Sequence, residues 1–499
     1  MIQALRFFLL LLCAIPTAAL AAPVSNPKEI TIAERPPNIV LLFADDLGWT
    51  GLGCFGSDLY ETPNLDALAA SGVRFTNAYS ACTVCSPTRA SLMTGMYPAR
   101  LHLTDFLTGQ NRPFAKMSIP DWTKQLDSHH VTVAEALRDA GYRTGHFGKW
   151  HLSRRGGDPK GTMPLDQGFD VSYPGPKQRA GYFLKDGLTS KTGTNFLTDI
   201  LTDKACEFID QSSSKPFFLY FAYNVPHTPI QGRPELVNYF QSKIKSQSAN
   251  KNLTHDNATY AAMVKSLDES VGRILKNLEQ NNLTQNTVVV FTSDNGGLTQ
   301  RYGKHDRFTE NLPLRRGKGS AYEGGVRVPM ITRWPSEQTT AWECDTPVMS
   351  IDLYPTFLEL AGASGDDRHN KTVDGLSIAG LIQGNQPAIE RNLFWHYPHY
   401  HAGGDGPYSA IRSKNYRLIH FHEDDSLRLY DLNKDIGEQD DLAEMMPEKA
   451  NSLMKLLNEW RWSVKAQMPS MNPDFDEARA TVVRKTNGKK KPSTKKKSN

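Results

Sequence analysis

Three apolar runs, each followed directly by polar residues, constrain the fold of this chain more than any other feature. They are rich in residues that favour strands, and their apolar character is continuous rather than alternating. Such runs are typical of strands that are buried on both faces of a parallel sheet. The expected strands span Asn38 to Ala44, Pro216 to Tyr223 and Thr287 to Thr292, and a shorter strand is expected from Tyr142 to Phe147.

Segments with helical periodicity separate these strands. Thr62 and Pro63 suit the N-cap and the first position of one such helix. The alternation of helices and buried strands predicts an α/β fold, in which helices cover both faces of a large, mixed but mostly parallel sheet. Ligands bind such sheets beyond the carboxyl ends of the strands, so polar residues there are candidate site residues. The expected helices span Thr62 to Ser71, Ser91 to Tyr97, Thr132 to Ala140, Phe196 to Asp210 and Tyr260 to Asn281.

The pattern changes after about residue 385. Ala410 to His422 and Leu427 to Leu432 alternate between apolar and polar residues, which predicts a small antiparallel sheet, and a helix is expected from Pro447 to Lys465. A chain of 499 residues is also long for one domain. We therefore expect a large α/β domain over residues 34–385 and a smaller C-terminal subdomain over residues 386–470. We expect residues 471–499 to form a basic, disordered tail.

The N-terminus predicts export. Arg6 precedes an apolar run from Phe7 to Ile15, and Ala19-Leu20-Ala21 is a suitable cleavage site, so residues 1–22 are expected to be a signal peptide. The run is too short to span a membrane, and we expect no transmembrane segment later in the chain. The mature protein is therefore predicted to be periplasmic or extracellular.

The charge gives no support to nucleic-acid binding. The formal net charge is +4, but the lysine-rich residues 484–497 contain no acid, so the rest of the chain is close to neutral. Export permits disulfides, but the cysteines are too few for a disulfide scaffold, and their pairing is left open. Apart from Cys13 and Cys85, the cysteines are Cys54, Cys82, Cys206 and Cys344.

Cys85 and Arg89 lie in the most informative motif, Cys85-Ser86-Pro87-Thr88-Arg89. A cysteine near the N-terminal end of a helix is expected to have a lowered thiol pKa, and an arginine one turn later can bind an anion. A buried structural cysteine explains the same residues equally well. The spacing alone leaves both interpretations open.

Two polar pairs follow predicted core strands and indicate a metal site. Asp45-Asp46 follows the first strand, and Asp294-Asn295 follows the last. Adjacent acids near a core are costly unless a cation neutralises them. Oxygen donors suit Ca²⁺, and no His/Cys cluster has zinc spacing. Helix capping or a solvated turn would explain either pair alone.

Cations and histidines lie in three further segments. Lys149 and His151 follow a predicted strand, and Lys318 lies in a basic, glycine-rich loop that suits a sulfate or phosphate. His227 lies between two prolines and is a candidate general acid or base, because the ordinary pKa of histidine is ~6.5. The alternatives are structural histidines and a basic surface loop.

Together these motifs resemble those of the type I, formylglycine-dependent sulfatases, including the arylsulfatases. Cys85, Pro87 and Arg89, followed by Leu92 and Thr94-Gly95, are similar to the family signature, and the other motifs follow in the same order from about residue 38 to residue 442. The resemblance implies an alkaline-phosphatase-like α/β fold with a small C-terminal sheet subdomain. It also implies a sulfuric ester hydrolase.

In that family the signature cysteine is oxidised after synthesis to formylglycine (3-oxoalanine), whose hydrate is the nucleophile. For this chain the resemblance implies that Cys85 is so modified, by a formylglycine-generating or anaerobic sulfatase-maturating enzyme, and that Arg89 holds the hydrate. It further implies one bound Ca²⁺. The implied ligands are Asp45, Asp46, the modified Cys85, Asp294 and Asn295.

The resemblance also implies roles for the cations and histidines. Lys149 and Lys318 would bind the sulfate, and His227 with Lys318 would protonate the departing alcohol. His151 would remove a proton from the nucleophile's second hydroxyl, which expels the sulfate.

The segment from Leu393 to Ser409 is dense in aromatic residues and histidines, which suit contact with a sugar ring. His399 and His401 are therefore expected to bind substrate, although a loop packed between subdomains is an alternative. We expect a sulfated poly- or oligosaccharide, with a galactose- or N-acetylgalactosamine-type sulfate favoured. The alternative functions are a formylglycine-dependent phosphoesterase or phosphonate hydrolase on the same fold, and an inactive glycan-binding protein.

Overall fold

The structure is a computed structural model. It describes residues 35–107, 109–153, 161–174, 181–184, 187–212, 214–249, 252–300, 307–335, 341–385 and 388–483. The expected signal peptide and the lysine-rich residues 484–499 lie outside the described residues. No helix in the described ranges is long and apolar enough to span a bilayer.

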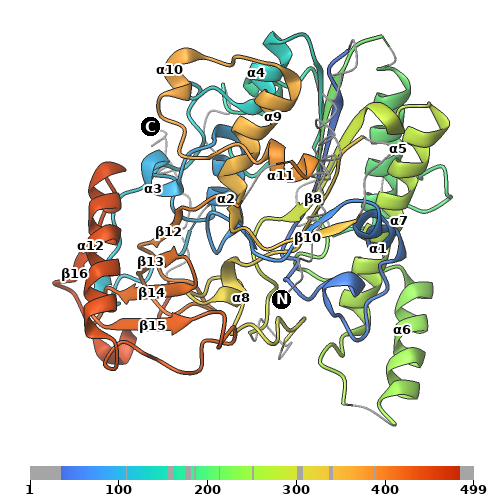
Figure 1. The fold of residues 1–499 in the computed structure, drawn as a ribbon. Helices are drawn as coiled ribbons and strands as arrows, with labels where there is room; N and C mark the ends of the chain where they lie inside the picture. Colours follow the sequence, from blue (N-terminus) through green and yellow to red (C-terminus); the bar gives the residue numbers. More distant parts are fainter. Residues whose placement is uncertain are drawn as a thin grey trace, which may run out of the picture. The chain divides into compact units, whose positions relative to one another are not determined.

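An eight-stranded mixed sheet forms the centre of the fold (Figure 1). Its strands are β1 (Asn38–Ala44), β2 (Val73–Phe75), β5 (Arg143–Gly148), β6 (Val171–Tyr173), β7 (Phe217–Ala222), β8 (Thr287–Ser293), β9 (Met330–Arg333) and β10 (Trp342–Cys344). They lie in the order β10-β2-β9-β8-β1-β7-β5-β6. The five strands from β8 to β6 are parallel, and β9 is antiparallel to both of its neighbours. The predicted mixed, mostly parallel sheet is confirmed.

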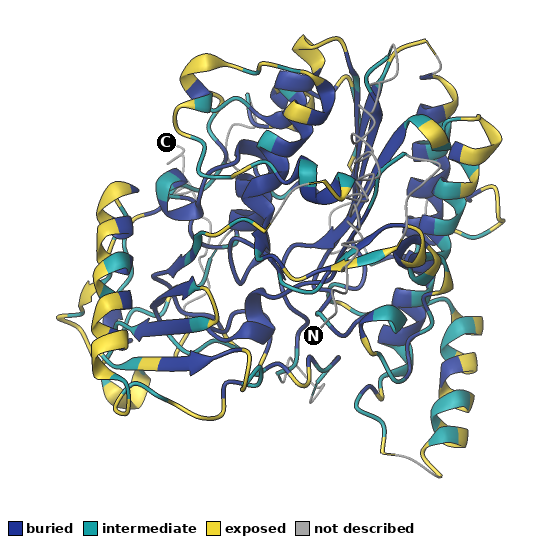
Figure 2. Ribbon diagram, viewed as in Figure 1, coloured by how far each residue is buried: buried dark blue, intermediate teal, exposed yellow. Residues whose placement is uncertain are grey.

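Helices cover both faces of this sheet and create two cores. Val40 and Leu42 of β1 point into one core, whereas Ile39 and Leu41 point into the other, because successive side chains of a strand face opposite sides. The strand is therefore buried along its whole length and apolar from Ile39 onward; in Figure 2 the strands of the central sheet are mostly drawn as buried. The first core includes residues of α1 (Pro63–Ala70), α5 (Leu197–Asp210), α6 (Pro234–Gln247) and α7 (Ala258–Gln280). The second includes residues of α2 (Cys85–Thr94), α4 (Val133–Asp139), α9 (Leu353–Ala361) and α11 (Ala379–Gln383).

Two helix predictions differ from the structure in detail. The helix expected from Ser91 to Tyr97 is α2, which begins at Cys85 and ends before Gly95, where the chain turns with φ +71°. Thr62 precedes α1 as predicted, but its hydroxyl does not cap the helix. It accepts from the Gly53 amide at 2.8 Å instead.

A four-stranded antiparallel sheet follows in the sequence, with α12 (Pro447–Ser463) packed against it, at the left of Figure 1. Its strands are β12 (Asn392–Tyr397), β13 (Tyr408–Ser413), β14 (Tyr416–Phe421) and β15 (Leu427–Asp431). The predicted antiparallel sheet is confirmed, although β12 was expected to be part of a loop. The described residues from Pro36 onward form one compact unit, and the domain boundary near residue 385 stays a prediction.

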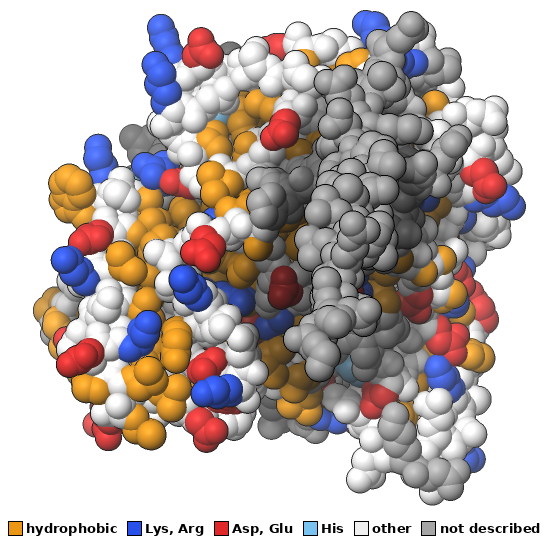
Figure 3. Space-filling view, in the orientation of Figure 1, with side chains coloured by type: hydrophobic (Ala, Val, Ile, Leu, Met, Phe, Trp, Pro, Cys, Tyr) orange, Lys and Arg blue, Asp and Glu red, His pale blue; other side chains and the backbone are white. Residues whose placement is uncertain are grey.

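Short elements complete the described chain. They are β3 (Ala78–Tyr79), β4 (Met117–Ser118), β11 (Val348–Met349), β16 (Ser470–Met471), α3 (Pro98–Leu101), α8 (Glu323–Val326) and α10 (Asp367–Asn370), with 3-10 turns at Gly53–Phe55, Pro164–Gln167, Thr284–Asn286, Ser350–Asp352 and Glu477–Arg479. The five described cysteines are all free thiols. On the face drawn in Figure 3, acidic and basic side chains of described residues are interspersed.

Candidate active site

The candidate site lies where neighbouring parallel strands end. β1 and β8 are paired so that Ala44 lies opposite Ser293, which places Asp45 and Asp46 beside Asp294. These three carboxylates and the neighbouring Asn295 are buried. The polar pairs that the sequence places after separate strands therefore meet at one edge of the sheet.

Short hydrogen bonds connect these residues. The Asp46 amide donates to Asp294 Oδ1 at 3.1 Å, and Asn295 Nδ2 donates to Asp46 Oδ1 at 2.8 Å. Asp46 has φ +65°, a left-handed conformation that turns the chain at the end of β1 and that aspartate tolerates better than most residues. The turn brings the Asp46 side chain beside Asp294 and Asn295.

One cation binds each carboxylate. The geometry is bidentate in two cases, and the third carboxylate is bound by two nitrogens of one guanidinium. The pairs are Lys149 Nζ with the two oxygens of Asp45 at 2.7 and 2.8 Å, Lys318 Nζ with those of Asp46 at 2.6 and 2.8 Å, and Arg89 Nη2 and Nε with Asp294 Oδ2 at 2.7 and 3.0 Å. The predicted cations thus converge on the predicted acids.

The adjacent carboxylates Asp45 and Asp46 differ in acidity. Burial raises the pKa of Asp45 to about 7, although Lys149 acts in the opposite direction. Burial acts the same way on Asp46, but Lys318 and His227 outweigh it and lower the pKa of that carboxyl. Asp46 is therefore ionised at neutral pH, whereas the charge of Asp45 depends on the cations around it.

Cys85 is the first residue of α2 and is 2% exposed. Its sulfur lies 3.3 Å from His151 Nδ1. Burial raises the pKa of the thiol, and the nearby Lys149 and Lys318 do not offset it. The expected low-pKa thiolate is therefore wrong, because desolvation outweighs the effect of the cations. As an unmodified thiol, Cys85 is protonated at neutral pH and a weak nucleophile.

His151 presents an unprotonated nitrogen to Cys85. Its Nε2 lies 2.9 Å from the Leu107 carbonyl, and because a carbonyl only accepts, the ring proton is on Nε2. Desolvation lowers the pKa of His151 well below 6.5, and Lys149 adds to the effect. The ring is therefore neutral, with Nδ1 free to accept a proton.

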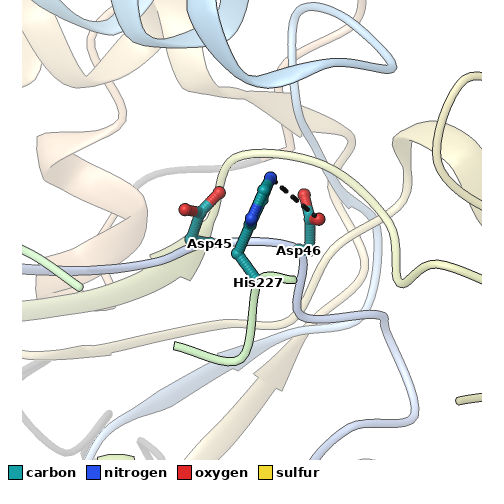
Figure 4. A group of neighbouring side chains, drawn as sticks. All are labelled: Asp45, Asp46 and His227. Atoms are coloured by element: carbon teal, nitrogen blue, oxygen red, sulfur yellow. Dashed lines mark ion pairs between the residues drawn. The ribbon is translucent and has the colours of Figure 1, made fainter. Parts of the chain in front are cut away.

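The His227 ring is drawn between Asp45 and Asp46 in Figure 4. Its Nε2 is 3.6 Å from Asp46 Oδ2, and its Nδ1 donates to the Thr228 carbonyl at 2.5 Å. Desolvation lowers the pKa of His227 to about 3, although Asp46 opposes the shift. Asp46 thus contacts both the imidazole of His227 and the ammonium of Lys318.

The donor set fits a hard divalent cation. Asp45, Asp46 and His227 each place one ligand atom within 4.8 Å of the others. Asn295 Oδ1 is buried, and no group in the described part of the chain donates to it. Carboxylate and amide oxygens are the ligands that Ca²⁺ prefers. The structure thus brings His227 next to the candidate ligands that the sequence indicates.

The two histidines expected to bind substrate lie in different surroundings. His401 packs against Gly319, where an added Cβ would lie 2.0 Å from its Nδ1, and Gly319 follows Lys318. His399 is 0% exposed, and its Nε2 is 2.7 Å from Thr104 Oγ1. Only His401 is brought next to a site residue, and the surroundings of His399 favour a structural role.

The aromatic segment is not the exposed loop that the sequence suggests. Trp395 lies in β12, is buried, and donates from Nε1 to the Ser80 carbonyl at 2.9 Å. The sequence places Asp405 only within the segment expected to contact a sugar, whereas in the structure it contacts the segment containing Lys318. Asp405 is 85 residues from its partner Ser320, and no local pattern indicates such a pairing.

The chain matches two family models. The model described as Sulfatase matches residues 37–363. The model described as N-sulphoglucosamine sulphohydrolase, C-terminal, matches residues 317–464. The first match includes all the residues that meet at the sheet edge, and the second includes the antiparallel sheet and α12.

Named proteins are similar over most of the chain. A sulfatase of Formosa agariphila is 32% identical over 88% of this chain and 90% of its own length. The N-acetylgalactosamine-6-sulfatase of Homo sapiens is 32% identical over 73% of this chain and 69% of the human protein. The crystal structure of Ps i-CgsB in complex with k-i-k-neocarrahexaose has 30% sequence identity and a TM-score of 0.69, over 88% of this chain and 95% of the other.

Proposed function

The chain belongs to the sulfatase family and is a sulfuric ester hydrolase, and we propose that its substrates are sulfated poly- or oligosaccharides. Two of the similar proteins support this substrate class. The human relative is an N-acetylgalactosamine-6-sulfatase, and Ps i-CgsB binds k-i-k-neocarrahexaose. A galactose- or N-acetylgalactosamine-type sulfate is the substrate that we would test first.

One observation supports the catalytic proposal most: Cys85 contacts His151 and lies within the electrostatic influence of the two lysines that bind Asp45 and Asp46. Two ammonium groups near this sulfur suit a tetrahedral anion that is bound beside Cys85. Sulfate is the anion that the family's chemistry requires at this place.

We propose that Cys85 is converted to formylglycine by a maturating enzyme. Burial raises the thiol pKa, so the encoded side chain is a poor nucleophile in its own surroundings. A soft sulfur ligand is also unsuited to a hard cation. When present, the hydrated aldehyde supplies an oxygen nucleophile, and Arg89 would hold it in place.

We propose that one Ca²⁺ is held by the carboxylates and the amide at the sheet edge. The closely grouped carboxylates of Asp45 and Asp46 and the unpartnered oxygen of Asn295 support this proposal. A bound cation acidifies a coordinated hydroxyl and offsets charge on the sulfuryl oxygens. Its ligands would be Asp45, Asp46, Asp294, Asn295 and the modified Cys85.

The chain's own residues then have distinct tasks. Lys149 and Lys318 bind the sulfuryl oxygens, where charge increases in the transition state. His227 and Lys318, which both contact Asp46, deliver a proton to the departing sugar oxygen. His151 accepts a proton at Nδ1 from the side chain at position 85 when sulfate is released. His401, beside Lys318, is proposed to contact the sugar.

The test is a panel of defined sulfated mono- and oligosaccharides, with Cys85→Ala as the inactive control. Release of sulfate from one sugar sulfate supports the proposal. Aryl sulfate and aryl phosphate are assayed in parallel, and a strong preference for phosphate or phosphonate esters would identify the alternative hydrolase. Glycan binding without turnover would identify an inactive binding protein.

Mass spectrometry of the exported, active protein tests the modification. Formylglycine formation removes one sulfur and two hydrogens at position 85 and adds one oxygen. Active protein with an unaltered thiol would contradict the proposal. The N-terminal sequence of the same material shows whether residues 1–22 are removed on export.

A further inference from the structure

The position of the Lys318 ammonium depends on a segment without regular secondary structure. Residues 315–322 contain no helix or strand and precede α8, with a turn at Lys318 and Gly319, where Gly319 has φ +84°. The Lys318 side chain is nevertheless buried and bound to Asp46. An ammonium on a long side chain keeps one place only if the backbone that bears it is fixed.

Asp405 fixes this segment on both sides of Lys318. Its Oδ1 pairs with Arg316 Nη1 at 2.8 Å, two residues before the lysine. Its Oδ2 accepts from Ser320 Oγ at 2.7 Å and from the Ala321 amide at 3.2 Å, after the lysine. One carboxylate thus closes the turn around Lys318.

The same segment is also bound to the chain just before Cys85. The Gly319 amide donates to the Thr83 carbonyl at 3.0 Å, and Thr83 Oγ1 donates to the Ser320 carbonyl at 2.8 Å. Ser320 is therefore bound by Thr83 on one side and by Asp405 on the other. Because Ser320 follows Lys318 by two residues and Thr83 precedes Cys85 by two, these bonds connect Asp405 to the backbone that carries both Lys318 and Cys85.

Asp405 belongs to the connection between β12 and β13, whose other residues also contact the turn. The His401 ring packs on Gly319, and an added Cβ on Gly404 would lie 2.2 Å from the Gly319 carbonyl oxygen. A connection in the C-terminal sheet is thus closely packed on the segment that presents a catalytic lysine.

We propose that Asp405 is a positioning residue for Lys318. Through Asp405, the connection between β12 and β13 of the C-terminal sheet then affects protonation of the leaving group. The inference rests on the proposed function, because Lys318 is the proposed donor to the sugar oxygen. In this role Asp405 acts through the turn and not by contact with sulfate or sugar. Its carboxylate holds the ammonium at the reacting centre by closing the turn.

Leaving-group dependence separates this role from a general structural one. An alkyl sugar oxygen needs protonation, whereas an aryl oxygen departs with little help. A displaced ammonium therefore slows sugar sulfates more than aryl sulfates. Misplacement of a catalytic group by about 1 Å costs up to ~10²-fold in rate, so Asp405→Asn should lose about 10- to 100-fold in kcat on a sugar sulfate and much less on p-nitrophenyl sulfate.

A second readout does not require turnover. In a Cys85→Ala background, Asp405→Asn should weaken the binding of inorganic sulfate, measured by calorimetry, because Lys318 no longer lies in place. If the wild-type chain hydrolyses no sulfate ester, the proposed function fails, but this binding measurement still tests the role of Asp405.

Asp374→Asn is a closely matched control. Asp374 also binds an arginine and a backbone amide, those of Arg100 and Tyr97, and its side chain is 11% exposed, against 10% for Asp405. Ser320→Ala is the second variant, which removes one hydrogen bond of the turn if Asp405→Asn fails to fold. It should change the same two quantities in the same direction by a smaller factor.

Two results would overturn the proposal. Equal loss on sugar and aryl sulfates with unchanged sulfate affinity would make Asp405 a purely structural residue. A raised KM for sugar sulfates alone, again with unchanged sulfate affinity, would mean that Asp405 contacts the sugar directly.

Discussion

His151 Nδ1 lies 3.3 Å from the Cys85 sulfur, while the Leu107 carbonyl binds Nε2 of the same ring at 2.9 Å. The carbonyl fixes the proton on the far nitrogen, so the near nitrogen has its lone pair directed at position 85. The Leu107 amide in turn donates to Ser86 Oγ at 3.2 Å. The base and the site of the nucleophile are therefore held by the same loop.

Removal of this base should affect turnover more than binding. His151→Ala is expected to lower kcat by roughly 10²–10⁴-fold, the usual contribution of a general acid or base. KM should change less, because both lysines that bind sulfate remain. Steady-state kinetics with p-nitrophenyl sulfate measures both constants. His129→Ala, at an exposed histidine, is the control, and a His151→Ala enzyme with normal kcat would exclude the assigned role.

Calcium should stabilise the protein through Asn295. A ligand at 100 times its Kd stabilises the folded state by about 2.7 kcal/mol, so added Ca²⁺ should raise Tm and chelation should lower it. Asn295→Ala removes the buried oxygen and should reduce the shift. Asn281→Ala, at a surface amide bonded to Asp210, should leave it intact. If Ca²⁺ raised the Tm of both variants by the same amount, the ion would bind elsewhere.

Acid should destabilise the fold through His146, which is fully buried among Trp150, Phe169 and Tyr220. Burial lowers its pKa to about 3, against ~6.5 in the unfolded chain. Between these values the unfolded state binds more protons, so stability decreases as pH falls, by about 1.4 kcal/mol per pH unit for this group.

The variant His146→Phe keeps an aromatic ring and removes this titration. Urea unfolding from about pH 4 to about pH 7 covers most of the interval between the pKa of His146 in the folded protein, about 3, and that in the unfolded chain, ~6.5. The stability of the variant should depend less steeply on pH over this range. Identical slopes for wild type and variant would show that His146 does not contribute to acid sensitivity.

The buried ion cluster around Arg417 should be sensitive to loss of its cation. Arg417 Nη1 lies 2.9 Å from Glu438 Oε1 and 3.2 Å from Glu323 Oε1, and all three side chains are buried. Arg417→Met leaves two buried carboxylates without this cation, at a cost of about 3–5 kcal/mol. Lys204→Met, in an exposed pair with Glu207, should cost about 0–1 kcal/mol. Comparable urea midpoints for both variants would contradict the expectation.

The sequence predicts the central strands and most of the site because both depend on local patterns. A continuous apolar run indicates β1 without knowledge of its neighbours, and Asp45 and Asp46 follow it directly. The meeting of these acids with Asp294 then follows from parallel pairing of β1 and β8.

Features that depend on distant packing were not predictable in this way. The raised pKa of Cys85 results from burial by segments far apart in the sequence, whereas the motif itself suggests a lowered value. The strand β12 is defined by its pairing with β13, and its aromatic residues, Trp395 among them, face a core that the sequence does not reveal. The contact of Asp405 with Ser320 likewise joins residues far apart in the sequence and depends on how the chain packs.

The shared direction of the central strands also makes the two edges of the sheet unequal for protein engineering. Every site residue that follows β1, β5 or β8 lies at their carboxyl ends, whereas the chain enters these strands at the opposite edge. A strand of seven residues separates the edges by roughly 20 Å. Insertions for labels or surface attachment before β7 or β8 should therefore leave the path of a long polysaccharide to the catalytic edge open.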